Sequence, residues 1–313
     1  MDTRLLGNFM AIVDCGSLSR AAEKLHVAQP ALSHQLAGLE ATFGTRLLIR
    51  SPGGVKPTKA GTALYRRARA ILAQMDSLAE AVRTGGEPES GSVAVGLPTS
   101  TAGLVAVPLL ERLMVRHPAI QLTLFESLSG YIADRVASGR LDLALLFRDT
   151  PTIGLAALPL LTEELFLIGE PRLFSLADDE PCPLHRLDGV PFVLSSALQG
   201  LRVLVERSFI QAGIALNVVA DCDSLTAVIL AARQGLACTI LSKSALAAYG
   251  GTVGVAVHPL VEPSIRRPVS LCWSTNLPRT AAAIAVQAIV VDLVGKLVAD
   301  GRWGGAEACP LNP

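Results

Sequence analysis

Residues 17–61 decide the fold of the first domain, and they read SLSRAAEKLHVAQPALSHQLAGLEATFGTRLLIRSPGGVKPTKAG. Ser17 or Ser19 can cap a helix, and Pro30 can open the next one, because a proline lacks an N–H that the first helical turn leaves unbonded. An apolar face at residues 5–13 predicts one more helix upstream. In the third helix the predicted buried stripe is Leu32, Leu36, Leu39 and Phe43.

The opposite face of the predicted third helix is narrow and polar. It carries Pro30, Ser33 and His34, with Gln29 at its start. Short side chains let a helix enter the major groove of DNA, and a glutamine can pair with the edge of adenine. The pattern therefore predicts a helix-turn-helix, although a small helical bundle with a polar outer face has the same periodicity.

Two short apolar runs follow, separated by the turn residues 51–54. They predict a β-hairpin, and Arg46, Arg50 and Lys56 make it basic. A basic hairpin beside a recognition helix is typical of a wing that lies on the DNA backbone. We expect residues 1–58 to form a winged helix-turn-helix domain.

Charge is distributed unevenly along the 313 residues, although the net charge is zero. Residues 1–70 hold ten Lys and Arg against four Asp and Glu, a net charge of +6, and residues 71–313 carry −6. A basic front indicates a polyanionic partner, although an ordinary surface fluctuation gives the same numbers.

The elements Ser-x-x-Ala-Ala, Gln-Pro-Ala-Leu-Ser, Leu-Glu…Phe-Gly and Pro-Thr-x-Ala-Gly occur here in register over about sixty residues. This stretch resembles the N-terminal signature of the LysR-type transcriptional regulators. The resemblance implies that Gln29, Pro30, Ser33 and His34 face DNA, with Arg50 and Thr58 near its backbone. Two positions depart from the family pattern: Ala28 replaces a Ser or Thr cap, and His34 replaces a common Arg.

A heptad pattern continues from residue 59 to about residue 85, and it predicts a long helix with an apolar seam. A second copy of the chain is the simplest partner for such a seam, although packing on its own domain is an alternative. We expect a flexible joint at residues 85–91. The predicted dimerisation residues are Leu64, Ala68, Ile71, Met75, Leu78 and Val82.

Beyond the joint, two βα sets alternate along residues 92–241, and a strand at 268–274 and a long helix at 279–299 follow. This order predicts parallel sheets and resembles the two-lobed, periplasmic-binding-protein-like effector domain of the same regulators. We expect an α + α/β chain with a linker helix at 59–90 and an effector domain at 91–313. Its lobe I would comprise 91–161 and 267–300, and lobe II 162–266. The Gly- and Pro-rich tail, 301–313, is expected to be disordered.

Ligands of open α/β sheets bind beyond the carboxyl ends of the strands, where helix N-termini point. Hydroxyls and bare amides at such positions suit a small polar or anionic effector, although Ser and Thr there can simply be helix caps. Arg148 is the nearest expected cation, and Asp223 is close to it on the other lobe. The predicted effector residues are Thr99, Ser100, Thr101, Ser127, Ser129, Phe147, Leu198, Gln199, Gly200 and Thr239.

The stretch beginning GLPTSTAGL at residue 96 looks closest to the branch around nitrogen assimilation control regulators, and some members of such branches work without an effector. No enzyme motif, cofactor motif or metal-spaced His cluster is visible, so we expect a regulator that is not an enzyme. The second half of the chain alone would also fit a solute-binding transport protein, but the helix-turn-helix does not fit that class.

Six dispersed cysteines fit free thiols in a reducing cytoplasm, with a redox-sensing pair as an alternative. No membrane segment is expected. The expected partners are double-stranded promoter DNA, a further copy or copies of the chain as homodimer or tetramer, a small effector and RNA polymerase.

Overall fold

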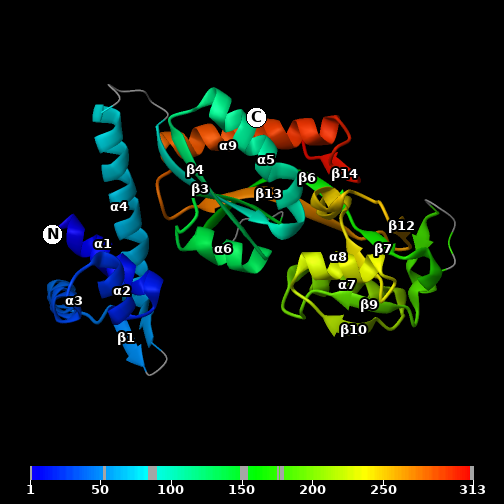
Figure 1. Ribbon diagram of the computed structural model, residues 1–313, viewed down its shortest axis with the longest axis horizontal. Helices are drawn as coiled ribbons and strands as arrows, with labels where there is room; N and C mark the ends of the chain where they lie inside the picture. Colours follow the sequence, from blue (N-terminus) through cyan, green and yellow to red (C-terminus); the bar gives the residue numbers. More distant parts are fainter. Residues whose placement is uncertain are drawn as a thin grey trace.

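The computed structural model describes residues 2–51, 54–83, 90–148, 154–174, 176 and 180–310. A small helical domain and a long helix, α4 (Lys59–Arg83), stand beside a two-lobed α/β region (Figure 1). This is the fold class that the sequence predicts. The tip of the expected hairpin, residues 52–53, and most of the expected joint at 85–91 lie outside the described residues.

The first domain packs three helices and a hairpin around one apolar core: α1 (Thr3–Cys15), α2 (Leu18–Leu25), α3 (Gln29–Phe43), β1 (Leu48–Ser51) and β2 (Gly54–Pro57). Ser17 caps α2, whereas Ala28 gives α3 no side-chain cap. Leu32, Leu36 and Leu39 are buried as expected. Phe43 is not: its exposed fraction is 43%, because it is the last residue of α3 and lies beyond the core.

Lobe I is a mixed six-stranded sheet in the order β14-β6-β13-β5-β3-β4. The strands are β3 (Gly91–Pro98), β4 (Ile120–Ser127), β5 (Leu143–Leu146), β6 (Leu155–Glu164), β13 (Arg266–Ser274) and β14 (Ala306–Ala308). β3 is parallel to β4 and β5, as the βαβ pattern predicts, while β13, β6 and β14 pair antiparallel. Two helices, α5 (Thr99–Arg116) and α9 (Ala281–Ala299), cover one face, and α6 (Ser129–Ala137) covers the other (Figure 1).

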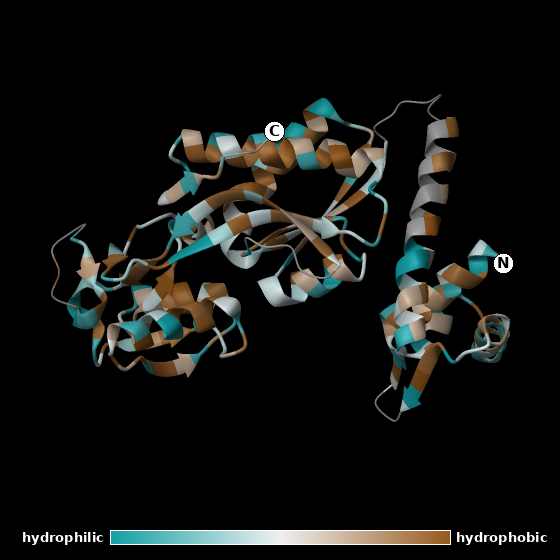
Figure 2. Cartoon of the chain, turned by 180° about the vertical axis from the view of Figure 1, so that it is seen from behind, coloured by the Kyte–Doolittle hydropathy of each residue, from teal (hydrophilic) through white to brown (hydrophobic). Residues whose placement is uncertain are grey.

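Among the described residues, α9 alone is long and apolar enough to cross a membrane by length and composition. In the fold it is a core helix, since one side of it packs on the sheet of lobe I. Figure 2 shows the apolar character of α9 and of the strands beneath it.

Lobe II has a four-stranded sheet, β11-β7-β12-β8, and a parallel pair, β10-β9. Its strands are β7 (Phe166–Gly169), β8 (Cys182–Pro183), β9 (Pro191–Leu194), β10 (Asn217–Asp221), β11 (Thr239–Leu241) and β12 (Ala256–Val261). Its helices are α7 (Gly200–Ala212), α8 (Leu225–Arg233) and the 3-10 segments η1 (Pro171–Leu173), η2 (Leu184–Leu187) and η3 (Lys243–Tyr249). A parallel bridge between Phe192 and Cys238 joins β9 to the segment before β11.

The expectation of a disordered tail is wrong for residues 301–310. Trp303 is 1% exposed within the core of lobe I, and β14 adds a strand to the edge of β6. The amide of Cys309 also donates to the carbonyl of Leu160 (2.9 Å). The Gly- and Pro-rich composition did not predict this ordered segment. One buried tryptophan and the pairing of an edge strand stabilise it despite the surrounding Gly and Pro residues.

Candidate functional site

The exposed face of α3 carries the side chains that the sequence assigns to DNA. Gln29, Pro30 and His34 are exposed, and Ser33 is half-buried. Arg50 on β1 donates from Nη2 to the hydroxyl of Ser33 (3.1 Å), so the hairpin and the recognition helix meet on one surface. Both elements therefore can contact one DNA duplex.

Three hydrogen bonds from backbone amides fix the hairpin against the helices. The carboxylate of Glu40 on α3 accepts from the amides of Leu47 (2.7 Å) and Leu48 (3.2 Å). On the other strand, the amide of Val55 donates to the carbonyl of Gly16 (2.9 Å). A Cβ on Gly54 would lie 2.6 Å from that carbonyl oxygen, so the close approach needs glycine.

Thr58 has an internal role. Its hydroxyl lies 2.9 Å from the carbonyl oxygen of Arg46, and it accepts from the amide of Gly61 (3.0 Å), which caps the first turn of α4. A Cβ on Gly61 would lie 1.9 Å from the carbonyl oxygen of Leu47. The Pro-Thr-x-Ala-Gly element thus joins hairpin and helix, and the Thr58 hydroxyl makes hydrogen bonds within the domain.

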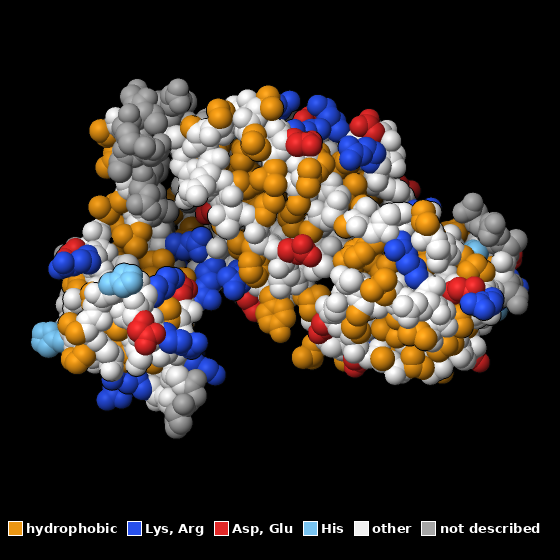
Figure 3. All heavy atoms as spheres, in the orientation of Figure 1, with side chains coloured by type: hydrophobic (Ala, Val, Ile, Leu, Met, Phe, Trp, Pro, Cys, Tyr) orange, Lys and Arg blue, Asp and Glu red, His pale blue; other side chains and the backbone are white. Residues whose placement is uncertain are grey.

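The heptad seam of α4 divides into two parts. Leu64 and Ala68 pack toward the interior, Leu64 against the core of the first domain. The later seam residues are exposed, from 40% at Ile71 and 46% at Met75 to 65% at Leu78 and 76% at Val82. Apolar atoms line the outer edge of α4 in Figure 3. A single protomer leaves this apolar row uncovered.

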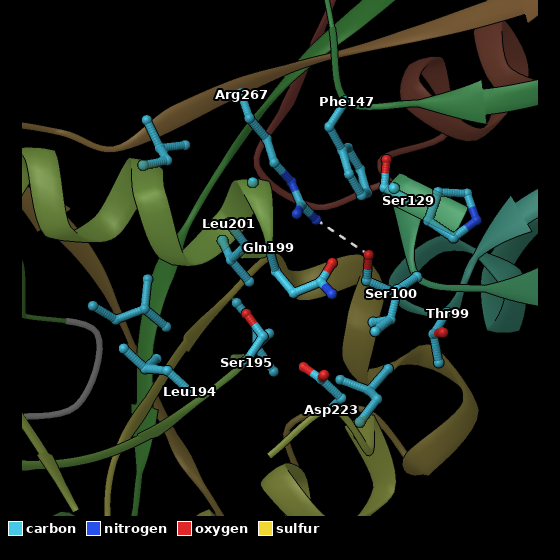
Figure 4. Close-up of a pocket in the computed structure, with 18 of the residues that line it drawn as sticks. Thr99, Ser100, Ser129, Phe147, Leu194, Ser195, Gln199, Leu201, Asp223 and Arg267 are labelled. Atoms are coloured by element: carbon cyan, nitrogen blue, oxygen red, sulfur yellow. Dashed lines mark hydrogen bonds between the residues drawn. The ribbon is translucent and has the colours of Figure 1, made fainter. Parts of the chain in front are cut away.

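A cavity of about 540 Å³ opens between the two lobes (Figure 4). Strand ends and helix starts from both lobes surround it, as the α/β rule predicts. It is lined by most of the residues that the sequence proposes, namely Thr99, Ser100, Ser129, Phe147, Leu198, Gln199, Gly200 and Thr239, and also by Arg148 and Asp223.

Thr101 and Ser127 do not line the cavity. Thr101 is fully buried, and its hydroxyl donates to the carbonyl of Pro98 (3.0 Å), because the third residue of α5 points back into lobe I. Ser127 is the last residue of β4, paired with Pro98. Position at a strand end was therefore too coarse a criterion for these two side chains.

Three helices begin at the cavity without a side-chain cap. The N-cap residues of α5, α6 and α7 are Pro98, Leu128 and Gln199, and none of their side chains accepts a hydrogen bond from the helix. The alternative that Ser and Thr are caps here therefore fails at these N-cap positions. Uncapped N–H groups with the positive end of the helix dipole favour an anion.

The sequence missed the cation beside these helix starts, Arg267 on β13. Its guanidinium donates from Nε to Glu163 on β6 (2.7 Å) and from Nη2 to Ser100 (3.2 Å), and it lies 3.5 Å from the centroid of the Phe147 ring. Glu163 is fully buried and also accepts from the indole of Trp303 (2.8 Å). Figure 4 shows Arg267 directed at Ser100 with Gln199 nearby.

A signal for this pair exists in the sequence. Glu163-Glu164 and Arg266-Arg267 lie at the two segments where the chain changes lobes, and the strands pair them in register. Two further hydroxyls, Thr239 Oγ1 and Ser195 Oγ, are buried without a hydrogen-bond partner among the described residues, and both residues line the cavity. A buried hydroxyl without a hydrogen-bond partner is unfavourable, so a polar group in the cavity would stabilise both.

All six cysteines are free thiols. Burial raises the pKa of Cys182 and Cys272 to about 11 and that of Cys238 to about 12. The thiolate is the reactive form, so these three thiols are poor redox sensors.

Two family descriptions match the chain. "Bacterial regulatory helix-turn-helix protein, lysR family" covers residues 3–62, and "LysR substrate binding domain" covers residues 86–294. The chain belongs to the LysR family of transcriptional regulators. This LysR-family protein therefore combines a helix-turn-helix DNA-binding domain with an effector-binding domain, which confirms the resemblance seen in the sequence.

Full-length relatives agree with this assignment. The LysR-family chain is 33% identical to the nitrogen assimilation regulatory protein nac of Klebsiella aerogenes over 308 residues, which cover 96% of this chain and 98% of the relative. The nac protein of Escherichia coli K12 is also 33% identical, with the same coverage. The similarity to the nitrogen assimilation branch extends over both domains.

Solved structures share the complete fold. A full-length OxyR variant from Pseudomonas aeruginosa matches with a TM-score of 0.74 at 20% identity, covering 100% of this chain and 99% of that chain. Full-length CbnR in complex with its target DNA matches with a TM-score of 0.62 at 22% identity, covering 95% and 99%.

Proposed function

We propose that this regulator reads promoter DNA with Gln29, Pro30, Ser33 and His34 in the major groove, while the hairpin lies on the backbone. The observation that carries the proposal is the hydrogen bond from Arg50 to Ser33, which unites helix and hairpin in one surface. Exposed Lys56 adds charge on β2. Phosphate contacts would supply affinity and the α3 side chains selectivity.

The test is a gel-shift titration on duplexes selected from a random pool. Gln29→Ala should weaken binding by about 1–3 kcal/mol and relax preference at one base pair. Arg50→Ala should weaken all duplexes and reduce the salt slope by about one charge. Arg116→Ala on α5 removes an exposed arginine far from α3 and is the matched control. Unchanged affinity of the Gln29→Ala, Arg50→Ala double variant would refute the assignment.

We propose further that a second copy covers the exposed seam of α4, giving a dimer that can assemble into a tetramer. The support is the row of exposed apolar residues that ends at Val82. Ile71→Asp with Leu78→Asp would place charges in this contact and should favour the monomer in sedimentation of the full chain. Val253→Asp, at an exposed apolar site in lobe II, is the control. A wild-type chain that sediments as a monomer contradicts the proposal.

We propose that the cleft binds a small anion, such as a carboxylate. Three uncapped helix starts, Arg267 and the unpaired hydroxyl of Thr239 support it. The effector-binding domain of QuiR, crystallised with shikimate, shares the fold with a TM-score of 0.58 at 20% identity, covering 66% of this chain and 99% of that chain. A bound anion could favour one lobe arrangement and change DNA binding through a coupling of about 1–3 kcal/mol.

The test is thermal stabilisation of the full chain by a panel of small carboxylic acids and their uncharged amides. Acids should stabilise and amides should not. Ser100→Ala with Gln199→Ala should reduce the stabilisation, whereas Ser92→Ala, on an exposed site of β3, should not. Equal stabilisation of the cleft variant would place the anion elsewhere, and no stabilisation by any acid would favour a regulator without an anionic effector.

We also propose that the DNA-bound protein contacts RNA polymerase in the cytoplasm, and we assign it no catalytic step. The support is that the relatives are named as regulatory proteins. In vitro transcription with purified polymerase from a bound promoter tests it. A transcript level independent of the regulator would refute the contact.

A further inference from the structure

A polar cluster joins the first domain to lobe I, away from both proposed binding surfaces. Arg140, in the turn after α6, donates from Nε to the hydroxyl of Tyr65 on α4 (3.2 Å). Its Nη2 lies 3.1 Å from the carboxylate of Asp14 on α1, and Tyr65 donates to the same carboxylate (2.7 Å). Figure 3 shows basic side chains where the first domain meets lobe I. One guanidinium from lobe I thus contacts two elements of the DNA-binding part.

The cluster is buried only at Tyr65, because the side chains of Arg140 and Asp14 are 32% and 38% exposed. Tyr65 is 4% exposed, and burial, with Asp14 as its acceptor, raises the pKa of the phenol. Beside it, burial lowers the pKa of Arg69, an effect that nearby Asp142 opposes. A hydrogen bond to a charged group is stronger where water is excluded. Removing one partner there leaves the other buried without a hydrogen bond, which is costly. The hydrogen bonds of buried Tyr65 therefore add to an Arg140–Asp14 ion pair that is itself partly exposed.

A backbone hydrogen bond attaches the turn that carries Arg140 to lobe I. Gly139 adopts a left-handed conformation (φ 75°), and the amide of Arg140 donates to the carbonyl of Arg135 in the last turn of α6 (2.7 Å). A Cβ on Gly139 would lie 2.3 Å from the end of the Leu277 side chain, so this turn packs closely against Leu277. The first turn of α6, at Ser129, lines the cleft at the other end of the same helix.

We propose that Arg140 is an interdomain latch: its contacts with Asp14 and Tyr65 fix the orientation of the DNA-reading surface relative to lobe I. Without it, the first domain together with α4 would pivot more freely against lobe I. Movement of α6 is the lobe I motion that would strain the latch directly, because the turn that carries Arg140 is bonded to that helix. The proposal does not require an effector, so it stands or falls separately from the proposed anion site.

The test is a pulsed electron-spin distance measurement in the full chain. Spin labels are placed at Lys24→Cys on α2 and Glu111→Cys on α5, both exposed positions, after Cys15, Cys222 and Cys309 are replaced by serine. The other three cysteines are buried thiols that label poorly. Excess unlabelled chain removes distances between protomers.

We expect a narrow distance distribution in the parent chain and a broader one in Arg140→Gln. Tyr65→Phe keeps the ring but removes both hydrogen bonds, and it should broaden the distribution as well. Arg135→Gln is the matched control, since Arg135 stacks on Phe125 within lobe I (4.2 Å). The latch is refuted if Arg140→Gln leaves the distribution unchanged, or if Arg135→Gln broadens it equally. Circular dichroism melts confirm that each variant is folded.

Discussion

Replacing Trp303 by phenylalanine should destabilise lobe I strongly, although Trp303 belongs to the C-terminal tail. Trp303 is 1% exposed, and its indole donates to fully buried Glu163 (2.8 Å). Losing a hydrogen bond to a charged group costs about 1.5–3 kcal/mol, and the smaller ring leaves a cavity worth about 1 kcal/mol more. We therefore expect a loss of about 2.5–4 kcal/mol in the free energy of unfolding.

Urea unfolding of the full chain, followed by circular dichroism, measures this loss. Trp273→Phe is the matched control, because Trp273 is half-buried and its ring contacts the guanidinium of Arg279 in a cation–π contact (4.7 Å). That contact is worth about 0.5–1 kcal/mol near the surface. Equal losses for the two tryptophans would show that Trp303 contributes only its apolar surface, and the reasoning from Glu163 would be wrong.

Gly61→Ala should destabilise the first domain, because the new Cβ would lie 1.9 Å from the carbonyl oxygen of Leu47; a melt unchanged from wild type would contradict this. At pH 8, a thiol reagent should modify Cys182, Cys238 and Cys272 only after unfolding, as mass spectrometry can show. Because these raised pKa values make the unfolded chain lose protons first, stability should fall as the pH rises from about 9 toward 11.

The first domain was the most predictable part, because its chemistry is local. Apolar spacing, a proline at the helix start and a Pro-Gly-Gly turn all act over a few residues, and α3 begins at Gln29 as expected. Strand ends likewise located much of the cleft. They misplaced Thr101, since only the packing of α5 decides which first-turn side chain faces inward.

Long-range contacts were not readable in the same way. Arg267 and Glu163 are 104 residues apart, and only the register of β13 on β6 brings them together. The proposed latch could not be predicted from local patterns either, since Asp14 and Arg140 belong to different domains. No local period encodes such pairs, so the cation of the cleft and the domain contact both needed the fold.

The pairing of the tail with β6 also determines when lobe I can finish folding during synthesis. Trp303 and β14 are synthesised after every other strand of lobe I, yet they complete a charged pair at the junction of the lobes. While the ribosome still encloses this segment, Glu163 lacks its indole donor and β6 lacks its neighbour on that side. Lobe I therefore reaches its final form only after residues 303–308 have left the ribosome, whereas the DNA-binding domain can fold long before.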